Sequence, residues 1–182
     1  MAEWEDRDII EGMKTPGKEE AAFSHLMKKY QERLYWHIRK IVVNHEDTDD
    51  VLQNTFLKIW KSLSDFRSDS KLFTWLYRIA TNEALSFLKQ KRRKSFTPLD
   101  DTENKLAEQL ESDPYFDGDE IQLKLQQSIL KLPEKQRVVF NMKYFDRLKY
   151  EEMAEILGTS VGALKASYHH AVKKIENMLR KD

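Results

Sequence analysis

The chain has 182 residues, 31 basic and 31 acidic side chains, and no cysteine. This length allows one domain or two small ones, and the low glycine and proline content favours helices over sheets. The lack of cysteine excludes disulfides and thiolate metal sites, and no apolar run is long enough to cross a bilayer. Because the opening residues are acidic and show no signal-peptide pattern, we expect a cytoplasmic protein without membrane contact.

Charge is segregated along the chain although the formal net charge is zero. Residues 18–95 hold 16 basic and 10 acidic residues, residues 96–120 hold 1 and 9, and residues 121–182 hold 12 and 7. Two basic blocks therefore flank a strongly acidic segment, which points to a polyanionic partner. Charged surfaces also keep ordinary domains soluble, so this pattern alone does not decide the function.

Apolar residues three and four positions apart predict a helix over residues 19–43 with one buried face. After a break at 44–46, a second helix is expected to use Asp47 as its N-cap, because a carboxylate accepts unpaired amides of the first turn. The polar residues 64–70 predict a loop. A third helix is expected over 72–93, and it ends in a cluster of lysines and arginines.

The second of these helices carries an apolar stripe on one face and polar side chains on the other. Phe56 and Trp60 belong to the apolar stripe, so we expect both rings in the core. Gln53 and Asn54 lie on the opposite face, where they are available for contacts with a partner.

Residues 96–120, FTPLDDTENKLAEQLESDPYFDGDE, combine acidic side chains with turn formers and little periodicity. We interpret them as a linker with a short helix near 104–111. In the free protein this acidic segment is expected to fold back on the basic faces on either side. The predicted fold is all-α, with an N-terminal domain over 1–95 and a C-terminal domain over 121–182.

Residues 149–175, KYEEMAEILGTSVGALKASYHHAVKKI, predict a helix-turn-helix, preceded by helices over 121–131 and after Pro133. Gly158 can adopt the left-handed conformation that ends a helix, and Ser160 can cap the next one. The second helix of such a motif lies in the DNA major groove. An ordinary helical hairpin is the alternative, because the motif has many false positives.

Three segments in this order resemble the two domains of bacterial sigma factors: DTDDVLQNTFLKIWKSL, FTWLYRIATNEALSFLKQKRRK and LPEKQRVVFNMKYFDRLKYEEMAEILGTSVGALK. The absence of a domain between them resembles the extracytoplasmic-function group. The resemblance implies a promoter-specificity subunit without catalytic activity, cofactor or small-molecule substrate. Its implied partners are core RNA polymerase, promoter DNA and the anti-sigma protein that members often have.

Two other classes of protein are the alternatives. A stand-alone regulator that binds an operator as a dimer would need a dimer helix or a ligand pocket, and the sequence offers no dedicated segment for either. An enzyme would need a reactive cluster, and the nearest approach is the acidic group at 47–50, which helix capping explains. Copurification with RNA polymerase separates these classes from a sigma factor.

The resemblance also assigns candidate site residues. For polymerase docking they are Asp49, Asp50, Gln53, Asn54, Phe56, Leu57 and Trp60. For the minus-ten element, where an unstacked base needs aromatic or polar walls and a cation for its phosphate, they are Phe66, Arg67, Ser68, Lys71, Trp75, Arg78, Asn82, Lys89, Arg92 and Arg93. For the minus-thirty-five element they are Ser160, Ala163, Lys165, Ala166, His169, His170 and Lys173.

Some of these assignments carry a competing interpretation. Trp75 either stacks on DNA or anchors its helix in the core. Many family members have Lys-Ser-Arg where this chain has Lys165, Ala166 and Ser167, so one phosphate contact is missing unless the neighbouring histidines replace it. His169 and His170 are not expected to bind a metal, because adjacent side chains on a helix diverge by about 100°.

Overall fold

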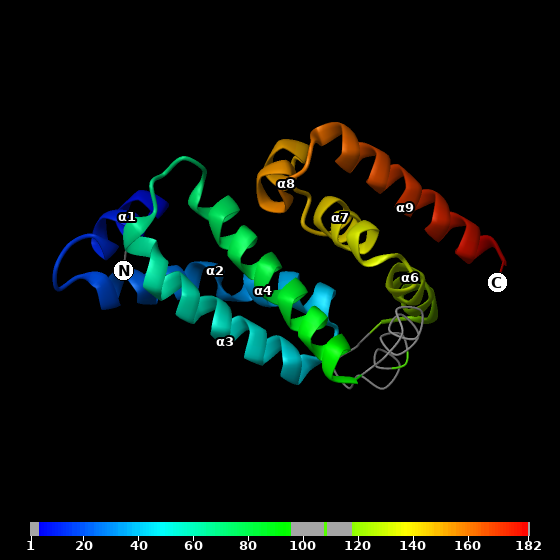
Figure 1. The fold of residues 1–182 in the computed structure, drawn as a ribbon, viewed down its shortest axis with the longest axis horizontal. Helices are drawn as coiled ribbons and strands as arrows, with labels where there is room; N and C mark the ends of the chain where they lie inside the picture. The colour runs from blue at the N-terminus through cyan, green and yellow to red at the C-terminus, as the bar shows by residue number, and fades with distance from the viewer. Residues whose placement is uncertain (1–3, 96–107, 109–117, 182) are drawn as a thin grey trace.

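The computed structural model describes residues 4–95, 108 and 118–181. All regular elements in these ranges are helices, as the sequence predicts (Figure 1). No helix among the described residues is long and apolar enough to span a membrane. Nearly all of the predicted linker, together with its short helix near 104–111, lies outside the described residues.

The N-terminal domain is built on three long helices that pack on one another: α2 (Glu19–Val42), α3 (His45–Ser62) and α4 (Leu72–Ser95). A short 3-10 helix, η1 (Leu63–Asp65), follows α3. Leu26, Ile59 and Leu76 are completely buried between the three helices. The periodic apolar residues of the sequence thus form the predicted common core.

The first helix, α1 (Asp6–Met13), was not predicted from the sequence. It lies across α2 and contacts η1. Ile9 is fully buried, and Gly12 lies so close to α2 that an added Cβ would come within 2.7 Å of the Ala22 Cβ. The helix is short and highly charged, so only its tertiary packing distinguishes it from a polar tail.

The corner between α2 and α3 differs from the prediction in its capping residue. Asn44, not Asp47, is the N-cap of α3, and its side-chain oxygen accepts a hydrogen bond from the Asp47 amide at 2.9 Å. Asp47 instead lies in the first turn and pairs with Lys91 of α4. Val43 takes a φ of 73° at this corner, which lets α3 begin directly after α2 ends.

The C-terminal domain contains α6 (Glu120–Leu130), α7 (Glu134–Tyr144), α8 (Tyr150–Leu157) and α9 (Val161–Lys181). Gly158 ends α8 with a φ of 64°, and the Ser160 hydroxyl accepts a hydrogen bond from the Ala163 amide at the start of α9. Both features were predicted, and they form the helix-turn-helix of α8 and α9.

The two domains pack against each other. α8 lies on α4, α7 contacts α2, and one buried cluster includes Leu76 of α4 together with Met142 and Met153 of the C-terminal domain. Figure 1 shows the helices of the C-terminal domain lying along one side of the α2–α4 bundle. The free chain therefore has a continuous apolar core that crosses the domain boundary.

Candidate functional site

An open apolar groove runs between α2 and α3. The residues that line it are Phe23, Met27, Gln31, Asp49, Leu52, Gln53, Phe56, Leu57 and Trp60. Leu57 is 53% exposed and Trp60 is 40% exposed, which is unusual for large apolar side chains. The groove therefore combines apolar area with a few polar groups, as a docking surface for another protein requires.

The expectation that Trp60 lies in the core is wrong, whereas Phe56 is buried as expected. The Trp60 ring packs edge-on against Phe23, with ring centroids 5.0 Å apart, and leaves its other side to solvent. All the residues that line the groove around Trp60 belong to α2 and α3.

The structure brings most of the predicted polymerase-binding residues to one place. Asp49 and Gln53 line the same groove as Leu57 and Trp60. Asp50 and Asn54 are exposed on the neighbouring face of α3, outside the groove. The sequence pattern did not single out Phe23 and Met27, the α2 wall of this groove, because only the packing of α2 on α3 places them there.

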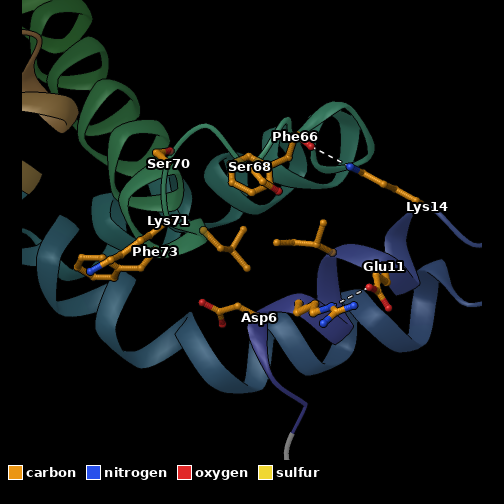
Figure 2. Close-up of a pocket in the computed structure, with 11 residues that line it drawn as sticks. Asp6, Glu11, Lys14, Phe66, Ser68, Ser70, Lys71 and Phe73 are labelled. Atoms are coloured by element: carbon orange, nitrogen blue, oxygen red, sulfur yellow. Dashed lines mark hydrogen bonds and ion pairs between the residues drawn. The ribbon is translucent and has the colours of Figure 1, made fainter.

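The loop between η1 and α4 separates two hollows. One lies between this loop and α1, and its loop-side residues include Phe66, Ser68 and Lys71 (Figure 2). Lys14, the residue directly after α1, donates a hydrogen bond to the Phe66 carbonyl at 2.9 Å and so fixes the loop against α1. Ser68 adopts a φ of 60°, which turns the chain sharply at the tip.

The second hollow lies on the other side of the loop, and Arg67, Trp75, Arg78 and Glu155 all line it. Phe66 belongs to both hollows, but the residue is only 5% exposed. The Trp75 ring is half-buried and packs on Phe66 with centroids 5.2 Å apart. Trp75 thus contributes to the core and also lines the hollow.

The remaining predicted minus-ten residues lie farther along α4. Asn82, Lys89 and Arg93 are exposed. Arg92 is partly buried and forms an ion pair with Glu134 of α7 at 2.6 Å. These residues are not gathered around the hollows, since the 14 positions from Arg78 to Arg92 correspond to about 21 Å of helix.

The first turns of α9 present an exposed face. It consists of Ala163, Lys165, Ala166, His169, His170 and Lys173. The Lys165 ammonium lies 5.7 Å from the centre of the Tyr150 ring, which positions it beside the start of α8. Ser160 is the cap of this helix. Among the described residues, no group of histidine, aspartate and glutamate side chains could hold a metal ion.

The wall that α1 gives to the first hollow was not found from the sequence. Asp6, Arg7, Glu11 and Lys14 line that hollow opposite the loop. The Asp6 carboxylate accepts a hydrogen bond from the Tyr30 hydroxyl at 2.8 Å. Burial, with the neighbouring Asp6, raises the pKa of Tyr30 above its ordinary value.

Two regions of the chain match known protein families. Residues 26–94 match sigma-70 region 2, and residues 122–175 match sigma-70 region 4. The chain is 30% identical to the RNA polymerase sigma-H factor of Pseudomonas aeruginosa, over 99% of this chain and 96% of that protein. It is also 30% identical to the ECF RNA polymerase sigma factor SigW of Bacillus subtilis, over 87% of this chain and 89% of that protein.

Two solved structures share the fold. CnrH, solved in complex with the cytosolic domain of CnrY, has a TM-score of 0.71 and 24% identity, covering 97% of this chain and 98% of that one. The sigma factor RpoE in complex with the anti-sigma factor NepR, from Bartonella quintana, has a TM-score of 0.67 and 19% identity. It covers 88% of this chain and 98% of that one.

The two helical regions and the exposed helix-turn-helix define a subunit that directs transcription. The chain belongs to the sigma-70 family of RNA polymerase sigma factors, within the extracytoplasmic-function (ECF) group. It is a non-catalytic subunit that directs RNA polymerase to specific promoters, and its partners are core RNA polymerase and promoter DNA. The operator-binding dimer and the enzyme are thereby set aside.

Proposed function

We propose that the α2–α3 groove is the surface through which this sigma factor docks on core RNA polymerase. The observation that carries this assignment is the exposure of Leu57 and Trp60 in an apolar groove with Asp49 and Gln53 at its edge. An exposed aromatic anchor surrounded by polar groups is typical of the centre of a protein interface. Asp50 and Asn54 would extend the contact onto the neighbouring face of α3.

The minus-ten element is assigned to the loop after η1 and to the exposed side of α4. Arg67, Trp75 and Arg78 line one hollow, and Ser68 and Lys71 line the other. An aromatic ring beside guanidinium and ammonium groups suits an unstacked base and its phosphates. The cations farther along α4 would follow the DNA backbone.

The minus-thirty-five element is assigned to the start of α9. Lys165 can donate to a guanine edge, and Ala163 and Ala166 leave room for thymine methyl groups. His169, His170 and Lys173 continue the same exposed face. We place this activity in the cytoplasm, where promoter DNA is found, and the NepR complex of RpoE supports an anti-sigma partner for this chain as well.

The docking assignment is tested with two matched leucine substitutions. Leu57→Ser removes an exposed leucine from the groove, and Leu179→Ser removes one that is 40% exposed at the end of α9. We expect Leu57→Ser to weaken binding to core polymerase in a pull-down titration, while Leu179→Ser binds like the parent. Equal affinities of the two variants would remove the groove from the interface.

A further inference from the structure

The N-terminal helix α1 is fixed to the body of its domain. Ile9 is completely buried, and the Tyr30 hydroxyl of α2 donates a hydrogen bond to the Asp6 carboxylate at 2.8 Å. Gly12 lets the two helices approach closely, since a Cβ at this position would collide with Ala22. α1 is therefore a firmly packed part of the domain, and its end is a fixed point from which a side chain can hold a neighbouring segment.

Lys14, directly after this helix, connects α1 to the loop that precedes α4. Its backbone amide donates to the carbonyls of Glu11 and Gly12, which anchors the lysine to the helix end. Its ammonium donates a hydrogen bond to the Phe66 carbonyl at 2.9 Å (Figure 2). The two residues are 52 positions apart, so the contact is a tertiary restraint on the loop. The charged donor makes this hydrogen bond stronger than one between neutral groups.

Phe66 is the residue at which the loop is fixed. It is 5% exposed, and its ring packs on Trp75 with centroids 5.2 Å apart. Its amide donates to the Leu63 carbonyl of η1 at 3.1 Å, while Lys14 holds its own carbonyl. Because a peptide group is planar, a fixed carbonyl also fixes the plane of the peptide bond to Arg67. The hydrogen bond from Lys14 therefore sets the direction in which the chain leaves Phe66.

The tip of the loop depends on this direction. Arg67, Ser68 and Asp69 are all exposed, and the buried residues on either side of the tip are Phe66 and Leu72. Ser68 has a φ of 60°, a conformation that is unfavourable for a residue with a side chain and that the surroundings must hold in place. The orientation of the Phe66 carbonyl therefore decides where the Arg67 and Ser68 side chains lie.

The surroundings of Lys14 favour a structural role over a contact with DNA. Asp6, Arg7 and Glu11 line the same hollow, and Arg7 pairs with Glu11 at 3.0 Å. The α1 wall thus carries two acidic and two basic side chains, whereas phosphate-binding surfaces are basic. Lys14 is itself exposed, so its substitution should leave the core of the domain intact.

We propose that Lys14 is a positioning residue for promoter opening, which anchors the loop to α1 and so holds Arg67 and Ser68 where they meet the unstacked minus-ten base. The role in opening rests on the minus-ten assignment above. α1 and Lys14 precede the part of the chain that matches sigma-70 region 2, which begins at residue 26. Region 2 of this chain thus works together with a preceding helix that orients its DNA-binding loop.

The restraint on the loop is measured in the full-length protein without DNA. Because the chain has no cysteine, a single nitroxide label can be placed on Asp69→Cys at the exposed tip. Lys14→Met removes the donor but keeps the length of the side chain, and it should make the label more mobile in the electron paramagnetic resonance spectrum. Lys14→Arg should keep the parent spectrum, because a guanidinium also donates to a carbonyl. Lys18→Met, at an exposed lysine four positions farther along, is the matched control.

Promoter opening is measured with unlabelled holoenzymes. Lys14→Met should form the open complex about tenfold more slowly than the parent and Lys18→Met, as expected for the loss of one hydrogen bond with a charged donor. Lys14→Arg should open promoters at the parent rate. All three variants should bind core polymerase equally, since only residues of α2 and α3 line the proposed docking groove. Circular dichroism establishes that each variant is folded.

The restraint and its role in opening fail in different ways. An unchanged label spectrum in Lys14→Met overturns the restraint, and slower opening in that case would mean that Lys14 contacts DNA directly. A more mobile label with an unchanged rate of opening overturns the positioning role. The minus-ten assignment fails separately if a holoenzyme with Arg67→Ala and Lys71→Ala opens promoters like the parent, because the label spectrum of the free protein does not depend on DNA.

Discussion

The α2–α3 groove and the outer side of α4 belong to the same small domain, but the C-terminal domain packs on the α4 side. The groove is mostly apolar, and its Leu57 and Trp60 face solvent. The α4 side is basic, and Lys71, Arg78 and Arg92 all bind oxygen atoms of the C-terminal domain. A basic surface can find its partner within its own chain, whereas this apolar surface is left for another protein.

Among the substitutions considered, replacing Trp60 should cause the largest loss of polymerase affinity. Trp60→Ala removes the aromatic anchor of the groove and is expected to cost about 2–4 kcal/mol of polymerase affinity, as central aromatic residues of interfaces do. Dyes on Glu32→Cys of α2 and Lys174→Cys of α9, both exposed positions, report on the packing of the two domains through energy transfer. Energy transfer between the dyes should stay at the parent value, since α4, α2 and η1 are the described elements that pack extensively on α3. A titration with core polymerase measures the affinity. A change in energy transfer would mean that the groove and the α4 side are coupled.

Replacing Lys165 tests a surface that stays exposed while the two domains pack together. Lys165→Ala should weaken binding to a minus-thirty-five duplex by about 1–3 kcal/mol if the lysine reads a base. Lys174→Ala, farther along α9, is the matched control. Asp146→Ala removes contacts with His37 and Lys40 of the other domain. The loss should be the same in this background, because the packing of the domains leaves this face of α9 uncovered. Equal weakening on all sequences, with a smaller salt slope, would mean that Lys165 contacts phosphate only.

Acidification should loosen the packing of the two domains, where the His37 Nδ1 lies 3.1 Å from the Asp146 carboxylate, but should not change the groove. Burial lowers the pKa of His37 below its ordinary value of 6.5, and this outweighs the neighbouring Asp146, which raises it. Lys40 on the same helix also lowers this pKa, and the ring is otherwise faced by Tyr77 and Thr81 of α4. The packed state therefore binds fewer protons than the state with separated domains, and the packing weakens as the pH falls through about 6.5.

Energy transfer measured between pH 7.5 and pH 5.5, about one unit to either side of the ordinary histidine value, tests this expectation. Burial alone would raise the pKa of the Asp146 carboxyl, but His37 and Lys40 outweigh it and hold this pKa below 3.8. Asp146 therefore stays charged across the range. His37→Gln should remove the pH response. Higher energy transfer in acid would mean that His37 is doubly protonated in the packed state.

Breaking the ion pair between Arg92 and Glu134 should change the energy transfer least. Both side chains are about a quarter exposed, at 25% and 27%, so the pair contributes about 1 kcal/mol at most. Arg92→Glu should lower energy transfer slightly, and adding Glu134→Arg should restore it. This restoration is the informative result, because a general loss of stability in the N-terminal domain would not be reversed by a substitution in the other domain.

Much of the fold could be predicted from the sequence because its signals are local. Apolar residues at helical spacing located α2, α3 and α4, and Gly158 with Ser160 located the turn of the motif. The start of α3 was misplaced because several residues in this stretch can cap a helix. The helix α1 was missed because its burial depends on α2, which follows it in the chain.

The residues of the site could be predicted from the sequence, but their arrangement in space could not. Trp60 follows the apolar period of α3, but it lies at the edge of the α2–α3 contact and is 40% exposed. His37 and Asp146 are 109 positions apart, and nothing in the pattern around either residue indicates the other. The covering role that the sequence assigns to the acidic segment 96–120 stays a prediction, because nearly all of this segment lies outside the described residues.

The acceptor for Arg78 has a consequence for how mutations reveal the interface between the two domains. It is the main-chain carbonyl of Glu155, so it is present whichever amino acid occupies position 155. A genetic screen for variants with increased promoter activity should find substitutions of Asp146 and Glu134, because these residues contact the other domain through their side chains. It should not find substitutions at position 155. Changes at Arg78 would also escape such a screen, because they remove a DNA contact together with the restraint. Sequence drift in the C-terminal domain can therefore alter the other contacts of the interface while this one persists.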